Sequence, residues 1–213
     1  MIGRVLLAAL LAGIAAGLIM GAIQHVRLTP LIMAAETFES ATAPPTDGAS
    51  RTFYSTVATM LTGAAFAAIL AGISLLAGIP ITARNGAMWG LCAFLAATLA
   101  PAAGLPPELP GMPAGDLAIR QVWWLGTIAA TGAGLYLIAA KRAVWSITAA
   151  ILLIAAPHVI GAPLANTHES SVPAGLAAAF AANSIAAGAL FWCFIGLFLG
   201  LAIDRFAKDS HAP

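Results

Sequence analysis

The chain has 213 residues, of which 61% are hydrophobic and only 8% are charged. Soluble domains have about 45–50% apolar and about 25% charged residues, so this composition excludes a soluble enzyme and intrinsic disorder. The net charge is only +1 and the basic residues form no continuous stripe, which argues against nucleic-acid binding. The two cysteines form no CxxC motif, which argues against a disulfide framework or a zinc ribbon. A multispanning membrane protein is what this composition predicts.

Six apolar stretches are each long enough to cross the roughly 30 Å of hydrocarbon in a bilayer. They are continuous and rich in Ala and Leu, so helices are expected rather than alternating β-strands. The expected fold class is all-α, a polytopic membrane helical bundle that forms a single integral membrane domain over 1–213. In chain order the expected spans are 5–26, 53–79, 86–103, 119–140, 144–162 and 176–203.

The first span, 5–26, also fits a cleaved signal peptide, because Arg4 precedes an apolar run. The run is longer than a usual signal sequence and no clear A-x-A site follows it, so a retained span is favoured. Within this span Gly13, Gly17 and Gly21 are spaced by four residues, which favours close helix packing.

The distribution of charge predicts the orientation of the spans. Six spans place both chain ends on one side, and six of the nine basic residues fall there, so the positive-inside rule predicts cytoplasmic termini. Most acidic residues and histidines fall on the outer side. The outer set is Glu36, Glu39, Asp47, Glu108, Asp116, Glu169, His25, His158 and His168.

Part of the chain repeats with an offset of 56 residues. The repeating unit would be a helical hairpin, and its even number of helices makes both copies point the same way, unlike inverted transporter repeats. A parallel repeat of hairpins is therefore a further hypothesis. The matching positions are Trp89 with Trp145, Pro101 with Pro157, and Pro107 with Pro163.

The outer loop 27–52 is expected to begin with a short amphipathic helix, in which Thr29 caps the start and Pro30 takes the first position. Glu36 and Glu39 would then lie on one helical face, and a divalent cation would relieve their repulsion. A solvated acidic face is the favoured alternative. The rest of the loop, 41–50, is expected to be a flexible tether.

The two later outer loops carry the other polar candidates. Glu108 lies in the proline-rich loop 105–116 and has no evident structural role, whereas Asp116 suits both helix capping and function. Arg120 can pair with Asp116 one turn away. His158, at the outer end of an apolar helix, suits a first-row transition metal, although such a histidine often bonds only a neighbour.

The sequence places no buried Asp, Glu, Lys or Arg within the membrane, since Arg120 lies at the outer end of the span 119–140, and this argues against a proton-coupled pump. The sequence also has no zinc-protease motif, no G-x-S-x-G elbow and no P-loop. The main polar side chains within the predicted spans are those of Thr56, Thr59, Thr62, Asn183 and Ser184.

Taken together, these segments resemble CbtA, a family of probable cobalt transporter subunits. The resemblance implies a bacterial inner-membrane protein of five or six spans, linked to cobalt supply for cobalamin biosynthesis. It also implies a partner of the CbtB type, which is small, has a single span and carries histidines. The matching residues are Gln24, the run 30–39, Leu105–Gly111, Asp116-Leu117, Arg120-Gln121 with Trp123-Trp124, Pro157-His158 with Ile160–Pro163, and Phe191-Trp192.

The outer polar residues and the resemblance together predict a cobalt uptake protein that is not an enzyme, has no cofactor and carries Co²⁺ as its transported ion. Residues from three outer loops are expected to form an extracytoplasmic metal-entry site, since Co²⁺ accepts imidazole and carboxylate ligands. The alternatives are a non-transporting scaffold or metal sensor and, ranked last, an intramembrane enzyme. The expected ligands, in order, are Glu36 and His158, then Glu108, then Asp116 and Glu39.

Overall fold

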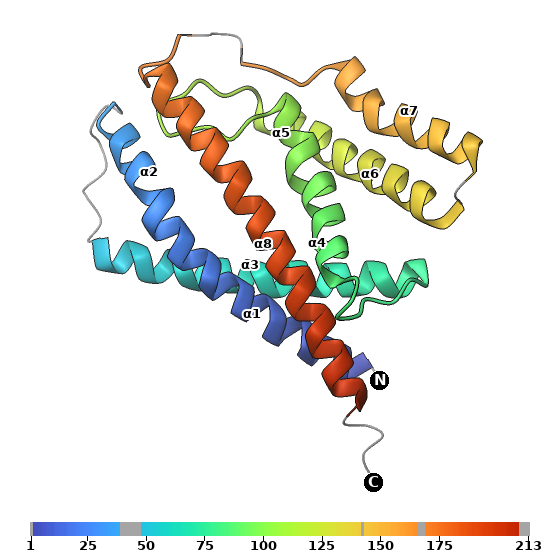
Figure 1. Ribbon diagram of the computed structural model, residues 1–213. Coiled ribbons are helices and arrows are strands. Elements are labelled where there is room, and N and C mark those ends of the chain that lie inside the picture. Colours follow the sequence, from blue (N-terminus) through green and yellow to red (C-terminus); the bar gives the residue numbers. More distant parts are fainter. Residues whose placement is uncertain (1, 39–47, 142, 166–168, 209–213) are drawn as a thin grey trace. The chain divides into compact units, whose positions relative to one another are not determined.

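A computed structural model describes residues 2–38, 48–141, 143–165 and 169–208 of the chain. These residues are all-α, with no strand among them, as the composition predicts. Figure 1 shows the α-helices, coloured in chain order. One short π-helix, η1, lies between α4 and α5. They are α1 (Ile2–Arg27), α2 (Thr29–Glu36), α3 (Gly48–Ala77), α4 (Gly86–Phe94), η1 (Leu95–Leu99), α5 (Ala100–Gly104), α6 (Leu117–Lys141), α7 (Val144–Ile160) and α8 (Ala174–Lys208).

Five helical segments are long and apolar enough to cross a membrane. They are α1, α3, the continuous helix Gly86–Gly104 that joins α4, η1 and α5, α6, and α8. The sixth apolar helix, α7, has 17 residues, which is at the short end of the range that spans a bilayer. The predicted all-α, membrane-spanning fold class is therefore confirmed.

The described chain forms two compact units. Unit 1 comprises Met1–Pro30, Ala41–Leu91 and Ala186–Pro213, and unit 2 comprises Leu31–Ser40 and Cys92–Ile185. Helices α4 and α8 are each divided between the two units, after Leu91 and after Ile185. The single membrane domain expected over 1–213 stays a prediction.

Helices α1 and α3 of unit 1 pack through their glycines. A Cβ atom added to Gly13 would overlap the carbonyl oxygen of Gly63, and one added to Gly63 would overlap that of Gly13. Gly17 lies equally close to the backbone of Met60. The spacing of small residues in the first span thus corresponds to a real close approach of two backbones.

The second contact inside unit 1 joins α8 to the start of α4. Gly196 and Gly86 face each other as closely as the glycines of α1 and α3 do. Before α4, the amide of Ala83 donates a hydrogen bond to the carboxylate of Asp204 at 2.9 Å, which ties the 78–85 connection to α8. Unit 1 is thus held by backbone contact and by satisfied polar groups.

Unit 2 contains the hairpin of α6 and α7, which run side by side (Figure 1). It also contains the repeat-related prolines Pro101 and Pro157, each in the last turn of its helix. The carbonyl of each proline accepts the amide four residues on, from Leu105 at 2.8 Å and from Gly161 at 3.1 Å. The two prolines, 56 residues apart, thus occupy the same local position at the ends of their helices.

Candidate functional site

An apolar cluster in unit 2 joins the segments that carry two of the predicted ligands. Its buried members are Ala35 of α2, Leu109 of the 105–116 loop and Val172, which precedes α8. Glu36 and Glu108 directly neighbour two of these residues in the chain, so the cluster fixes the backbone that carries both carboxylates. Partly buried side chains of Ile32, Met112, Leu176 and Phe180 pack around it.

A hydrogen bond adds a second link between two of these segments. The hydroxyl of Ser171 donates to the backbone carbonyl of Phe38 at 3.2 Å. This bond connects the end of the α2 segment to the residues before α8, beside the apolar cluster. The segments are therefore joined by apolar packing and by a polar contact.

Glu108 forms an ion pair with Arg120 of α6. The Nη2 and Oε2 atoms are 2.7 Å apart, and the side chains are 20% exposed for Arg120 and 26% exposed for Glu108. The expectation that Glu108 lacks a structural role is therefore wrong. The expected pairing of Arg120 with Asp116 is also not what the structure has, because the proline-rich loop turns Glu108 back onto α6.

Asp116 caps the start of α6. Its Oδ1 atom accepts the amide of Ile119 at 3.0 Å, and its backbone carbonyl accepts the amide of Arg120 at 3.0 Å. A carboxylate here satisfies amides that the first helical turn leaves unpaired and suits the positive end of the helix dipole. Capping explains this residue, and a metal-binding role for it stays a prediction.

His158 lies in the last turn of α7 and is exposed. Its ring makes a T-shaped contact with that of Trp123, with ring centroids 5.9 Å apart and planes at 75°. The indole N–H of Trp123 donates to the carbonyl of Pro157 at 3.1 Å, which fixes the tryptophan beside the histidine. The hydrogen bond and the half-buried position of Trp123 give it a packing role inside unit 2, whereas the neighbouring Trp124 is exposed.

Trp123 also packs against the end of α5. A Cβ atom added to Gly104 would run into the indole ring and approach the Cβ of Ala162 at 2.9 Å. The glycine thus leaves the space that the indole fills. The tryptophan connects the end of α5 with the end of α7, and His158 rests on that connection.

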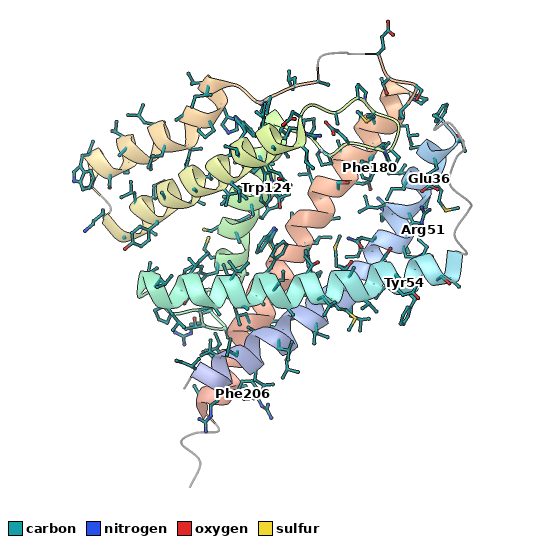
Figure 2. The ribbon with its side chains drawn as sticks, turned by 180° about the vertical axis from the view of Figure 1, so that it is seen from behind. Glu36, Arg51, Tyr54, Trp124, Phe180 and Phe206 are labelled. Carbon is teal, nitrogen blue, oxygen red and sulfur yellow. The ribbon has the colours of Figure 1, made fainter. Side chains whose placement is uncertain are left out.

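Glu36, which is labelled in Figure 2, is the last residue of α2. Its side chain is half-buried. Its predicted neighbour on the same helical face, Glu39, lies outside the described residues. The expected pairing of these two carboxylates around a cation therefore stays a prediction. Phe180, labelled on α8 in the same figure, is one of the side chains that pack on the apolar cluster.

Within the described ranges, no group of three or more His, Cys, Asp and Glu side chains is placed to hold a metal ion. The structure instead holds Glu108, Asp116 and His158 each by a contact of its own. Arg120 and Trp123 are three residues apart on α6, so Glu108 and His158 attach to adjacent positions of one helical face. Near the start of α6 the described residues thus offer the exposed imidazole of His158, the half-buried carboxylate of Glu108 and the exposed carboxylate of Asp116, which do not form a complete set of metal ligands.

No curated protein and no solved structure matches this chain. A family model described as "Probable cobalt transporter subunit (CbtA)" matches residues 2–204, which takes in nearly all of the helices described above. A subunit of a transporter works with at least one partner and is not expected to be an enzyme. The chain therefore belongs to the CbtA family of probable cobalt transporter subunits, as the proline-rich and Pro-His motifs predict.

Proposed function

We propose that this protein is the membrane-embedded component through which Co²⁺ enters a bacterial cell across the inner membrane. Membership of the CbtA family over residues 2–204 is the observation that carries the proposal. The apolar helices support a membrane location. The excess of basic residues beside both chain ends supports cytoplasmic termini, with the 105–116 loop outside.

The proposed metal-entry site uses Glu36, Glu108 and His158. Carboxylate and imidazole groups suit Co²⁺, and the order of affinities places Ni²⁺ next to it, so the supply of metal and the geometry decide between the two ions. The apolar cluster supports this site because it holds the segments of both carboxylates together. Glu39 and Asp116 are secondary ligands in the proposal.

Arg120 has a defined part in this proposal. Its guanidinium neutralises Glu108 before metal arrives, because a half-buried carboxylate without a counter-charge would be costly. An arriving divalent cation competes with Arg120 for the same oxygen atoms. The ion pair thus holds the Glu108 carboxylate in place until a metal ion displaces the guanidinium.

The remaining ligands are proposed to come from a small, single-span, histidine-bearing partner. His158 is exposed at the end of α7, so its imidazole is accessible to such a partner. A shared ligand shell is in keeping with the finding that the described residues contain no complete metal-binding group. The metal would then bind securely only when both proteins are present.

Uptake of radioactive cobalt tests the proposal, in bacterial cells that lack their own cobalt importers and express this chain with its small partner. We expect uptake above that of the empty vector and of either protein by itself, with excess Ni²⁺ as competitor. Glu36→Gln should lower uptake strongly. Glu169→Gln is the matched control, because that exposed carboxylate belongs to no proposed site.

Two results would contradict the proposal. One is wild-type uptake by Glu36→Gln at equal membrane abundance, which would remove this carboxylate from the site. The other is no uptake by a correctly inserted pair of proteins, which would favour a scaffold or sensor. Reporter fusions at both chain ends check the orientation independently.

A further inference from the structure

The sulfur of Met112, in the proline-rich loop, accepts a hydrogen bond from the backbone amide of Leu109 at 3.3 Å. The same two residues are joined a second time, because the amide of Met112 donates to the carbonyl of Leu109 at 3.2 Å. Methionine usually fills apolar space, and its thioether is a weak acceptor. A methionine sulfur that satisfies a backbone amide therefore calls for a physical explanation.

The turn that carries Met112 does not need this sulfur in order to form. Pro110 and Gly111 are its two central residues, and Gly111 has a φ of +82°, which glycine adopts at no steric cost. Proline in the second position and a positive φ in the third are typical of a type II turn. The backbone bond from Met112 to Leu109 already closes that turn, so the bond to the sulfur does something further.

The amide of Leu109 lies where an acceptor is needed. Leu109 is 3% exposed and belongs to the apolar cluster with Ala35 and Val172. A buried amide without an acceptor would cost free energy, and within the described part of the chain the sulfur of Met112 takes that place. The side chain of Met112 packs against the same cluster, which holds the sulfur beside the amide.

The orientation of this amide bears directly on Glu108. The N–H of Leu109 and the carbonyl of Glu108 belong to one planar peptide unit, so fixing the direction of the N–H fixes the whole unit. This limits the directions that the side chain of Glu108 can take from its own Cα atom. The carboxylate of Glu108 is the one that meets Arg120 at 2.7 Å.

We propose that Met112 is a positioning residue for Glu108. Its thioether fixes the peptide unit that follows Glu108, and the carboxylate is thereby held at Arg120, ready for an arriving metal ion. The sulfur is occupied by the amide of Leu109, so the carboxylate binds the metal and the thioether does not. The effect on metal uptake rests on the proposed function, whereas the hold on Glu108 can be measured without any transport.

The hydrogen bond can be tested on the purified full-length protein in lipid nanodiscs. Glu108-Leu109 is the one Glu-Leu pair in the chain, so labelling glutamate with ¹³C and leucine with ¹⁵N gives a single NMR signal for the Leu109 amide. Met112→Leu keeps an apolar side chain of similar volume but removes the acceptor. The Leu109 amide should then exchange with deuterium about tenfold faster or more, at a melting temperature close to that of wild type.

The hold on Glu108 has a readout of its own. The side-chain N–H signal of Arg120 reports its ion pair with Glu108, and Arg120→Gln identifies that signal by removing it. In Met112→Leu the signal should move toward its position in Glu108→Gln. Met33→Leu is the matched control, because Met33 is a 54% exposed methionine of α2 in the same unit, and it should change neither signal.

Uptake of radioactive cobalt then tests the consequence for transport. Met112→Leu should raise the cobalt concentration for half-maximal uptake about 3–10-fold and leave the maximal rate unchanged, because a less well-held carboxylate binds metal more weakly. A purely structural role would instead lower the maximal rate through a loss of folded protein. Met33→Leu should match wild type in both quantities.

Three results would overturn the positioning role. They are equal protection of the Leu109 amide in wild type and Met112→Leu, faster exchange with an unmoved Arg120 signal, and a lower maximal rate at an unchanged cobalt requirement. A different result would contradict the function proposed above and leave the positioning role standing. It is a changed amide and a changed Arg120 signal together with a wild-type cobalt requirement, which would remove Glu108 from the metal-entry site.

Discussion

The two units of this protein use their residues in different ways. In unit 1, helices meet at glycine backbones, and polar side chains are paired, as Gln24 is with Thr59 at 2.9 Å. In unit 2, two helices contain proline near their ends, a π-helix interrupts one of them, and Thr131 is left without a partner among the described residues. The four described candidate ligands, Glu36, Glu108, Asp116 and His158, all belong to unit 2.

The difference between the two units suggests that unit 1 mainly stabilises the fold and that unit 2 mainly carries the binding groups. Close backbone contact leaves no space for a ligand and tolerates little change, which suits a scaffold. Irregular helices and loops expose carbonyl groups, carboxylates and an imidazole, which suits binding. Substitutions in unit 1 should therefore act mainly on folding, and those in unit 2 mainly on transport.

The largest expected effect is that of Gly63→Ala in unit 1. The new methyl group would overlap the backbone of Gly13, so we expect a loss of about 1–3 kcal/mol in the free energy of unfolding. Gly72→Ala on the same helix has open space around it and should leave stability unchanged or raise it by up to about 1 kcal/mol. Melting in detergent measures both, and equal melting temperatures would contradict the close packing of α1 and α3.

Trp123→Phe in unit 2 should have the next largest effect. It removes the indole donor to Pro157, at a cost of about 1 kcal/mol, and releases the ring that supports His158. Cobalt uptake should fall several-fold while the protein still folds. Trp124→Phe is the control, since that neighbouring ring is exposed, and a similar loss in both variants would mean that the tryptophans act only as membrane anchors.

Arg120→Gln should change the affinity for metal in a defined direction. It frees Glu108 from its counter-ion, so half-maximal uptake should occur at a cobalt concentration about 3–10-fold lower. Arg120→Lys keeps the positive charge and should remain near wild type. An unchanged or weaker affinity in Arg120→Gln would show that the ion pair does not compete with metal.

Asp116 should show the smallest effect of the four. Asp116→Ala removes the cap of α6 and should cost about 1 kcal/mol of stability, while Asp116→Asn keeps an oxygen acceptor and should melt close to wild type. Cobalt uptake then separates capping from metal binding. Normal uptake by Asp116→Asn supports a cap alone, whereas a strong loss in that variant would make the carboxylate a ligand.

The sequence predicts the fold class well because the relevant signals are local. Apolar length predicts membrane helices, small residues at every fourth position predict that the first span packs closely against another helix, and an acid before α6 suits its cap. Each of these depends on neighbours within a few positions of the chain. Exact helix ends and the division into units depend on packing between distant segments.

The site was predicted less completely than the fold class, because its contacts join residues that lie far apart in the chain. Glu108 and Arg120 are twelve residues apart, and only the path of the proline-rich loop brings them together. The bond from Trp123 to Pro157 spans 34 residues, so the sequence pattern could show only a tryptophan at a membrane boundary.

The most direct test of the central claim compares cobalt uptake in His158→Ala with that in His25→Ala, at equal abundance in the membrane and with the partner protein present. Both imidazoles are exposed at the end of an apolar helix, but His25 belongs to unit 1 and contacts Thr52, at 3.2 Å. Our account predicts that His158→Ala abolishes most uptake and that His25→Ala retains it. Wild-type uptake in His158→Ala, or an equal loss in both variants, would contradict a metal-entry site in unit 2.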